Sequence, residues 1–246
     1  MKTGLATESD FPWLDEHERF SFPDPRGAHG DGIVGVGGNL SPGMLISAYR
    51  QGIFPWFSEG EPVLWWSPDP RFVVFPDSLH VSRSMRKVLR QRRFEFTIDR
   101  CFEAVVESCA SVERTHEDGT WITEDMQRAY KRLHEAGFAH SVETWRGGEL
   151  VGGLYGVSFG RAFFGESMFS RVTNASKGAF ILLSRLLFNC GFRFIDAQVY
   201  TPHLEQLGAV EVPRTEFLDQ LAEALQSPDA RGLWTAWEPD LLSSIP

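Results

Sequence analysis

The sequence predicts an α+β protein with a small helical domain at the N-terminus and a larger mixed domain after it. Apolar residues recur at helical spacing up to residue 137, whereas strand-like patterns occupy 139–169. A strongly apolar helix and one further strand follow over 174–199. With 246 residues, 42% of them hydrophobic, the chain can bury a large core. We expect a boundary near residue 70, which gives domains 1–70 and 71–246.

The N-terminal domain begins with a polar arm and contains one well-marked helix. Residues 1–30 are rich in Pro, Gly and charged side chains, which predicts a loosely held arm. Ser41 and Pro42 are typical of a helix start, and Gly52 is typical of its end. The glycines of 35–38 lack the GxGxxG spacing of a dinucleotide-binding loop, so we expect a turn there.

A stiff aromatic segment ends this domain. Residues 65–71 read WWSPDPR, and Phe54, Trp56 and Phe57 lie just before them. Each proline fixes its own φ and biases the preceding residue towards an extended backbone, while each indole buries a large apolar area and has one N–H to satisfy. We expect a packed clamp between the domains, a platform for a flat or apolar ligand, or both.

A cationic segment interrupts an otherwise acidic chain. The net charge is −9, yet residues 83–93 hold six Lys and Arg side chains and no acid. We read the segment as a helix capped by Ser82, because its apolar residues line one face. The opposite face carries Arg83, Arg86, Lys87 and Arg90. Uncompensated cations repel one another, so we favour RNA or another polyphosphate as a partner over an ordinary solvated face.

The larger domain continues with helices, a meander, a helix and a strand. Asp99 and Thr123 are typical N-caps of helices that end near Cys109 and Gly137. Three strand-like segments joined by glycine turns predict an antiparallel meander over 139–145, 149–158 and 161–169. The remaining elements are an apolar helix over 174–191, a strand over 192–199 and a short helix from His203.

Composition argues against metal, disulfide and membrane proteins. Cys101, Cys109 and Cys190 form no CxxC pair, and the seven histidines show no HExxH motif. No stretch approaches the roughly 20 apolar residues that span a bilayer, and the N-terminus lacks the apolar run of a signal peptide. We therefore expect a soluble, cytoplasmic, monomeric protein without a bound metal.

The order of the meander, the apolar helix and the strand resembles the GNAT acyltransferase fold, in which a cleft beside the helix brings an acyl donor to an amine. GNAT enzymes that use acetyl-CoA carry a Q/R-x-x-G-x-G/A loop before that helix, and residues 170–178 lack its glycines. CoA is therefore disfavoured as the donor. A G-x-S-x-G nucleophile elbow is also absent, because Phe169 stands where the second glycine is needed, so we expect no serine hydrolase.

Two acidic residues lie on the predicted strands that flank the apolar helix. Glu166 and Asp196 are costly in an apolar sheet unless they are paired or hydrogen-bonded. A structural ion pair would explain each of them, but apolar neighbours such as Phe163 and Met168 favour an apolar pocket with a few polar groups. Gln198 shares a strand face with Asp196, because side chains two residues apart point the same way.

Eight motifs in the same order and spacing resemble the leucyl/phenylalanyl-tRNA–protein transferase family. They are GNLSPGMLISAYRQGIFPWF (38–57), WWSPDPR (65–71), HVSRSMRK (80–87), GTWIT (119–123), AYKRLHEAGFAHSVE (129–143), ELVGGLYGV (149–157), GESMFSRVTNASK (165–177) and IDAQV (195–199). The resemblance covers about residues 32 to 238. It implies transfer of Leu, Phe or Met from aminoacyl-tRNA to the N-terminal Arg or Lys of an acceptor protein, which marks that protein for degradation.

The resemblance also implies roles for particular residues. The pocket for the Leu or Phe side chain would be formed by Leu154, Phe163, Ser167, Met168, Leu183 and Ile195. The residues around the terminal adenosine and the mouth of the site would be Tyr49, Trp56, Trp121 and Tyr130. Those that hold the tRNA acceptor stem would be Arg83, Lys87 and Arg90. Catalytic roles would fall to Asp196 and Gln198, which assist the attacking amine, and to Glu166 at the edge of the pocket.

Three functions remain open at this point. An aminoacyl transferase uses an activated ester as its donor, so it requires no ATP, metal or CoA cofactor. A GNAT-like acetyltransferase of small amines would bind acetyl-CoA. A non-catalytic RNA-binding protein would bind charged and uncharged tRNA equally well. Under the first function, we expect Trp65 to hold the domains together, and Trp56 and Tyr49 to face the bound adenosine.

Overall fold

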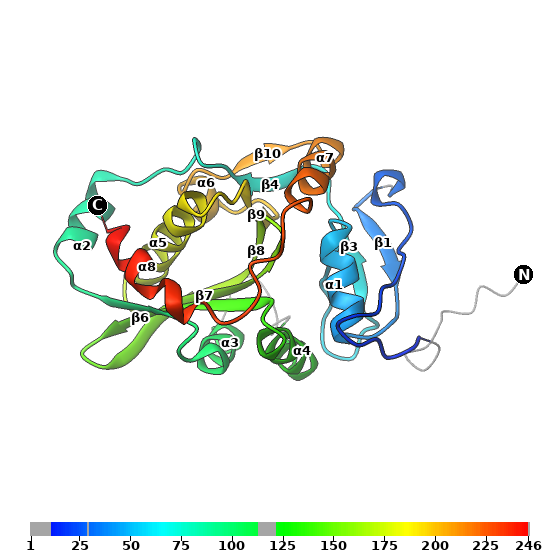
Figure 1. Ribbon diagram of the computed structural model, residues 1–246, viewed down its shortest axis with the longest axis horizontal. Coiled ribbons are helices and arrows are strands. Elements are labelled where there is room, and N and C mark those ends of the chain that lie inside the picture. The colour runs from blue at the N-terminus through cyan, green and yellow to red at the C-terminus, as the bar shows by residue number, and fades with distance from the viewer. Residues whose placement is uncertain (1–10, 29, 113–121, 246) are drawn as a thin grey trace, which may run out of the picture.

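The larger domain is built on a seven-stranded mixed sheet (Figure 1). A computed structural model of the protein describes residues 11–28, 30–112 and 122–245. The spatial order of the strands is β10-β4-β9-β8-β7-β6-β5. Their bounds are β4 (Arg71–Val74), β5 (Glu95–Ile98), β6 (Ala139–Arg146), β7 (Glu149–Phe159), β8 (Ala162–Ser170), β9 (Phe194–Gln198) and β10 (Val210–Val212). Neighbouring strands are antiparallel except β8 and β9, which run parallel.

The predicted meander and apolar helix are confirmed. Strands β6, β7 and β8 pair in sequence as antiparallel ladders, and α5 (Ala175–Asn189) connects β8 to β9. The order of meander, apolar helix and strand, on which we based the GNAT-like prediction, is therefore present, and the two strands that α5 links are parallel neighbours. The protein is therefore of the α+β class, as the sequence indicates.

Helices cover both faces of the sheet. On one face α5 packs against β6, β7 and β8, and the helices on the other face are α3 (Phe102–Ala110) and α4 (Glu124–Glu135). Two neighbouring glycines of β7 show this arrangement. A Cβ on Gly152 would meet Ala175 of α5, and a Cβ on Gly153 would approach Val105 of α3. Successive strand residues point to opposite faces, so each face has its own apolar cluster.

The C-terminal elements are α6 (Pro202–Glu205), α7 (Arg214–Ala224), η3 (Trp234–Trp237) and α8 (Glu238–Ser243). The buried side chains of η3 and α8 belong to the apolar cluster of the α5 face, whereas those of α7 belong to the cluster of the other face. Helix α8 contacts both α5 and β5, and α2 (Arg83–Arg90) also packs on α5 (Figure 1). Among the helices of the described ranges, none is both long enough and apolar enough to cross a membrane.

The N-terminal domain is mixed, which differs from the helical domain that we expected. Besides the predicted helix α1 (Pro42–Arg50), it contains the short 3-10 helix η2 (Pro25–Gly27) and a three-stranded sheet. The strands of this sheet, in the order β1-β3-β2, are β1 (Ile33–Val36), β3 (Leu64–Trp66) and β2 (Phe54–Pro55). The difference arises at the tryptophan pair, because each indole N–H finds a backbone acceptor only when the pair is extended: Trp65 donates to Gly37 O (2.8 Å) and Trp66 to Trp56 O (2.7 Å).

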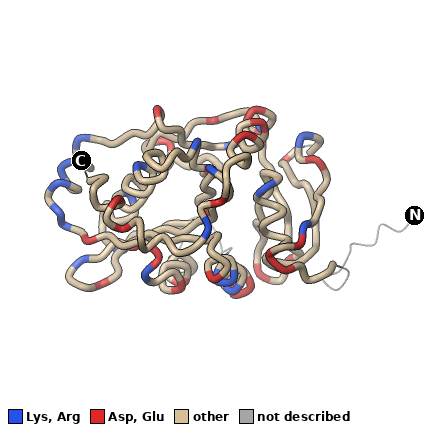
Figure 2. Tube along the Cα trace, in the orientation of Figure 1, with Lys and Arg blue, Asp and Glu red and all other residues tan. Residues whose placement is uncertain are grey.

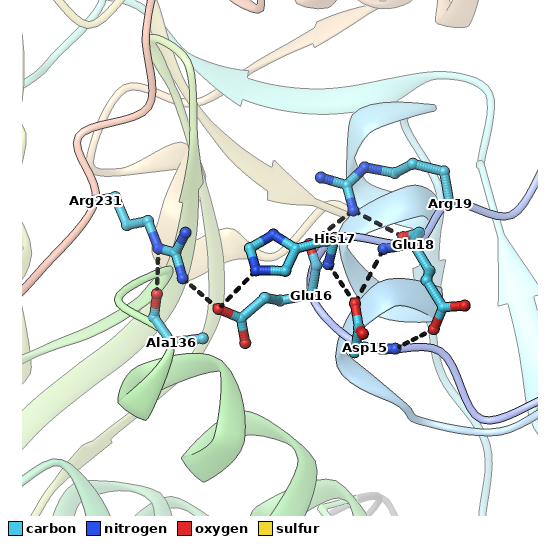
Figure 3. Close-up of polar contacts among 7 residues, drawn as sticks. All are labelled: Asp15, Glu16, His17, Glu18, Arg19, Ala136 and Arg231. Atoms are coloured by element: carbon cyan, nitrogen blue, oxygen red, sulfur yellow. Dashed lines mark hydrogen bonds and ion pairs between the residues drawn. The ribbon is translucent and has the colours of Figure 1, made fainter.

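The described part of the arm is held in place rather than loose. The backbone N–H of Leu14 donates to Ser41 Oγ (3.1 Å) at the start of α1. Glu16 forms an ion pair with Arg231 of the C-terminal segment (2.5 Å), and Arg231 Nε donates to Ala136 O at the end of α4 (Figure 3). The arm thus joins α1, α4 and the C-terminal segment.

Asp99 does not cap α3, contrary to our expectation; Cys101 stands at the cap position. The backbone of Asp99 is left-handed (φ 55°), which turns its carboxylate away from the helix. That carboxylate accepts hydrogen bonds from Ser141 N (2.9 Å), Trp234 N (2.7 Å) and His140 Nδ1 (2.9 Å). Asp99 therefore anchors the C-terminal segment to the sheet.

Replacing Trp65 by Ala should lower the free energy of unfolding by about 3–5 kcal/mol. The side chain of Trp65 is 2% exposed and packs on Phe22 with ring centroids 4.9 Å apart, so its removal leaves a cavity and an unpaired Gly37 carbonyl. Urea unfolding measures the change. Trp13→Ala is the matched control, because Trp13 is 57% exposed, and it should cost less than about 0.5 kcal/mol. Equal losses in the two variants would contradict a packing role of Trp65, whose contacts with Phe22 and Gly37 lie within the N-terminal domain.

Candidate active site

An apolar pocket of about 560 Å³ opens where β8 and β9 separate. The parallel pairing of these strands ends at Phe164 and Asp196, and the residues that follow on both strands line the pocket. The remaining walls include residues of β7, α5, α6 and the β2 segment with Trp56. The apolar side chains of the walls include Leu154, Phe163, Met168, Phe180, Ile195 and Leu204. Both the volume and the lining are typical of a site for a small organic group.

Glu166 joins four elements at this pocket. Its Oε1 accepts hydrogen bonds from the Tyr49 hydroxyl of α1 (2.7 Å) and from Gln198 Nε2 of β9 (2.9 Å). Its Oε2 accepts one from the Tyr130 hydroxyl of α4 (2.6 Å). The two phenolic oxygens also lie 2.5 Å apart. We call these four residues the Glu166 cluster.

The oxygen–oxygen contacts of the Glu166 cluster outnumber the protons that its two phenols carry. The Tyr49, Tyr130 and Glu166 oxygens make three such contacts, and each hydrogen bond needs one proton. Two neutral phenols carry two protons, whereas an ionised carboxylate carries none. A protonated Glu166 provides the third proton, and in that state one of its two tyrosine contacts runs from the carboxyl O–H to the phenol oxygen. The geometry therefore favours a neutral carboxyl group.

The electrostatic surroundings lead to the same conclusion. Burial raises the pKa of Glu166 to about 7, and although the hydrogen bonds from Tyr130 and Tyr49 oppose this shift, the charge of Asp196 adds to it. Burial also raises the pKa of both tyrosines well above the ordinary value. The phenols stay neutral, and Glu166 exchanges a proton near neutral pH.

Asp196 is engaged in a buried ion pair with Arg71. Both side chains are 0% exposed, and Arg71 binds the carboxylate through Nε (2.9 Å to Oδ1) and Nη2 (2.6 Å to Oδ2). Arg71 Nη1 donates to Gly52 O (3.2 Å), and the guanidinium lies over the rings of Phe54 and Phe217. Arg71 therefore compensates the charge that Asp196 carries into the sheet.

Asp196 also fixes the backbone of Gln198. Its Oδ1 accepts the Gln198 N–H (2.8 Å), and Gln198 has a φ of 65°, which is uncommon for a residue other than glycine. This conformation directs the Gln198 amide to Glu166. With the ion pair occupying its carboxylate, Asp196 is suited to hold Gln198 in position rather than to take a proton from a substrate.

The structure brings most of the predicted site residues together. Those that line the pocket are Leu154, Phe163, Glu166, Ser167, Met168, Ile195, Asp196, Gln198 and Trp56. Leu183 belongs to the same apolar cluster and is not part of the wall. Tyr49 and Tyr130 are fully buried against Glu166 and do not lie at the mouth. Trp121 lies outside the described residues.

Arg71 and His203 are among the residues of the site that have no role in the sequence-based assignment. Arg71 closes the WWSPDPR motif directly before the apolar run FVVF, and a charge that leads into a buried strand is a signal for a buried ion pair. His203 also lines the pocket, and burial lowers the pKa of its imidazole. The sequence marks His203 only as the start of a short helix.

The cationic helix is confirmed as α2. Ser82 Oγ accepts the N–H of Met85 (3.2 Å) as its N-cap, and all six cations of residues 83–93 are exposed. Figure 2 marks their positions along the chain in blue. Leu89 on the buried face of α2 reaches Gly178 of α5, where a Cβ would lie 3.6 Å from it. Ser176, in the same turn of α5, lines the pocket. The cationic helix and the pocket therefore both adjoin the N-terminal part of α5.

These features define an enzyme class. An apolar pocket with a proton-sharing carboxyl group, close to a cationic helix, suits a transferase whose substrate joins an apolar group to a polyanion. Within the described ranges, no group of three or more His, Cys, Asp and Glu side chains is arranged to bind a metal ion.

Comparison with known proteins shows the family. The family models described as leucyl/phenylalanyl-tRNA protein transferase and its N-terminal domain match residues 73–222 and 38–69. Transferases of that name from Desulfatibacillum aliphaticivorans and Syntrophus aciditrophicus are 56% and 55% identical, over 89% and 92% of this chain and 94% of each relative. The Pseudomonas aeruginosa protein is 53% identical over 93% of this chain and 97% of its own. The chain belongs to the leucyl/phenylalanyl-tRNA–protein transferase family.

Solved structures show weaker similarity. A GCN5-related N-acetyltransferase-like protein from Streptococcus suis is 14% identical with a TM-score of 0.32, over 58% of this chain and 59% of its own. The L-PGS protein of Bacillus licheniformis is 12% identical with a TM-score of 0.36, over 81% of this chain and 68% of its own.

Glu166→Gln should remove a pH dependence of stability. A carboxyl group whose pKa rises from 4.5 to about 7 binds more protons in the folded than in the unfolded state between those values. Its stabilising contribution is complete below pH 4.5 and is lost as the pH rises to 7, on the order of 3 kcal/mol. Unfolding measured at pH 5 and pH 8 should therefore show the variant gaining stability relative to the wild type at the higher pH.

The exposed Glu149→Gln variant is the control and should keep the pH dependence of the wild type. Parallel stability curves for Glu166→Gln and the wild type would show that Glu166 does not titrate near pH 7.

Proposed function

We propose that the protein transfers Leu, Phe or Met from aminoacyl-tRNA to the N-terminal Arg or Lys of acceptor proteins, forming a peptide bond that marks them for degradation. The pocket carries this proposal, because it is apolar and because its lining contains five of the six residues that the family resemblance assigns to binding the Leu or Phe side chain. Family membership supports the same donor and acceptor classes.

We infer that the donor binds at two places at once. The amino-acid side chain enters the apolar pocket, while the acceptor stem of the tRNA lies along the exposed cations of α2. The two places adjoin the same turn of α5, as the positions of Ser176 and Gly178 indicate. Such an arrangement fixes the ester between them, so binding energy is used to position the reacting carbonyl.

The reaction exchanges an ester for an amide, so the donor already contains the required activation. The free α-amine of the acceptor, with an ordinary pKa of about 7.7 to 8.0, attacks the carbonyl carbon as a neutral nucleophile. A C–N bond forms, the C–O bond to the ribose breaks, and the amine proton ends on the ribose oxygen. The neighbouring ribose hydroxyl can pass that proton on, so no side chain needs to act as a general base.

We propose that Gln198 is the residue that binds the attacking amine. Its Nε2 is held by Glu166, which leaves the amide oxygen Oε1 oriented to accept a hydrogen bond from the amine. Asp196 acts on this step as a positioning residue through the backbone of Gln198.

The pocket is formed within one chain, and we propose a cytoplasmic monomer that uses no cofactor.

Incubation with Leu-tRNA or Phe-tRNA and a peptide that begins with Arg tests the proposal. The expected result is a mass increase of one Leu or Phe residue on the peptide, and no increase on a matched peptide that begins with Asp. Binding of tRNA without any transfer would instead support an RNA-binding protein. Acetylation of a small amine from acetyl-CoA would support an acetyltransferase.

Replacing Arg83, Lys87 and Arg90 together by Ala should weaken tRNA binding at least tenfold. It should also reduce the slope of log K against log salt by about 2 to 3, because up to three phosphate contacts are lost. Filter binding at several salt concentrations measures both. The control is the double variant Arg128→Ala, Lys131→Ala on α4. Both side chains are exposed, but they form ion pairs with Glu124 and Glu103, so their removal should leave the slope unchanged. An unchanged slope in the triple variant would show that α2 is only a solvated face.

A further inference from the structure

Trp234 lies behind the wall of the amino-acid pocket. It belongs to η3 of the C-terminal segment, beyond the residues 73–222 that the family model matches, and it is 2% exposed. Its ring centroid lies 6.0 Å from that of Phe163, and Phe163 lines the pocket. Trp234 itself is not among the lining residues, and its ring contact with Phe163 connects it to the pocket.

The position of the Phe163 ring leaves it few directions in which to move. The ring occupies the space where Gly156 of the neighbouring strand β7 has no side chain: a Cβ there would lie 2.6 Å from its Cζ atom. Ile195 of β9 is its partner on the other side. With Gly156 of β7 against the ring and β9 paired on the other side of β8, we infer that the ring can shift towards the pocket or towards Trp234. The indole therefore limits how far the wall can recede.

The indole of Trp234 is itself held rigidly. The backbone N–H of Trp234 donates to Asp99 Oδ2 (2.7 Å), and the indole Nε1 donates to Ala230 O (2.8 Å). Its ring stacks on the imidazole of His140, with centroids 3.6 Å apart and an interplanar angle of 6°. His140 is fixed by Asp99 as well. A buried side chain with this many contacts is suited to serve as a fixed stop.

We propose that Trp234 sets the depth of the amino-acid pocket through Phe163 and thereby determines the preference between Leu and Phe. The inference rests on the proposed transfer of these residues. Leu and Phe differ mainly in length and volume, and an apolar pocket distinguishes such side chains by its size. A receding Phe163 ring leaves Leu with fewer contacts and gives the larger Phe side chain more room.

A competition assay tests the inference. Leu-tRNA and Phe-tRNA are supplied at equal concentrations with a peptide that begins with Arg, and the two products are counted by mass spectrometry. Trp234→Ala should raise the Phe-to-Leu product ratio about tenfold, the scale on which pocket size discriminates apolar side chains. Trp234→Phe should raise it by a smaller factor, and it preserves an aromatic ring in case the Ala variant fails to fold.

Trp237→Ala is the matched control. Trp237 also stacks on Trp234, with centroids 4.7 Å apart. The proposal gives it no part in supporting Phe163. This variant should keep the wild-type ratio. In a Phe163→Leu background, Trp234→Phe should no longer change the ratio, because the ring through which it acts is gone.

Equal loss of Leu and Phe transfer in a folded Trp234→Phe variant, with an unchanged ratio, would overturn the inference, since a purely structural role lowers both products alike. The same shift in Trp237→Ala would also overturn it. A wild-type protein that transfers neither residue would instead refute the proposed function.

Discussion

The Glu166 cluster is the interaction on which the rest of the site depends. It joins Tyr49 from the N-terminal domain to Tyr130 of α4, Glu166 of β8 and Gln198 of β9. The pocket therefore reaches its final form only when the two domains are packed together. One apolar cluster extends through both domains, so the packing that stabilises the fold also places the polar groups of the site.

Two buried carboxyl groups occupy opposite environments on neighbouring strands. Asp196 is compensated by the Arg71 guanidinium, whereas Glu166 is surrounded by two phenols and an amide. Burial without a cation raises the pKa of Glu166 to about 7, and the proton count of the cluster also favours the neutral acid. Asp196 thus holds the backbone N–H of Gln198, and Glu166 holds the side-chain amide of the same residue. Together they orient a single amide towards the space where an amine would attack.

The sequence predicted the elements whose signals are local. The meander and α5 follow from apolar periodicity and glycine turns, and α2 with its Ser82 cap follows from helical spacing. The short strands β1, β3 and β4 carry too few residues to show a period, and their conformation depends on acceptors far away in the chain, such as Gly37 O for Trp65.

The candidate site shows the same division between local and long-range signals. The motifs identified Glu166, Asp196 and Gln198, because polar residues in an apolar strand stand out. They could not show that Arg71 occupies the Asp196 carboxylate, nor that Tyr49 and Tyr130 share protons with Glu166, since those contacts join residues 36 to 125 positions apart. Trp234 and Phe163 are also distant in the sequence, so no local pattern connects them.

The most direct test of the central claim is a crystal structure with a non-hydrolysable 3′-phenylalanyl-adenosine analogue bound. The account predicts the phenyl ring between Phe163 and Met168, the amide oxygen of Gln198 facing the carbonyl carbon, and Asp196 still paired with Arg71. A phenyl ring outside this pocket, or an Asp196 that leaves Arg71 to contact the ligand amine, would contradict it.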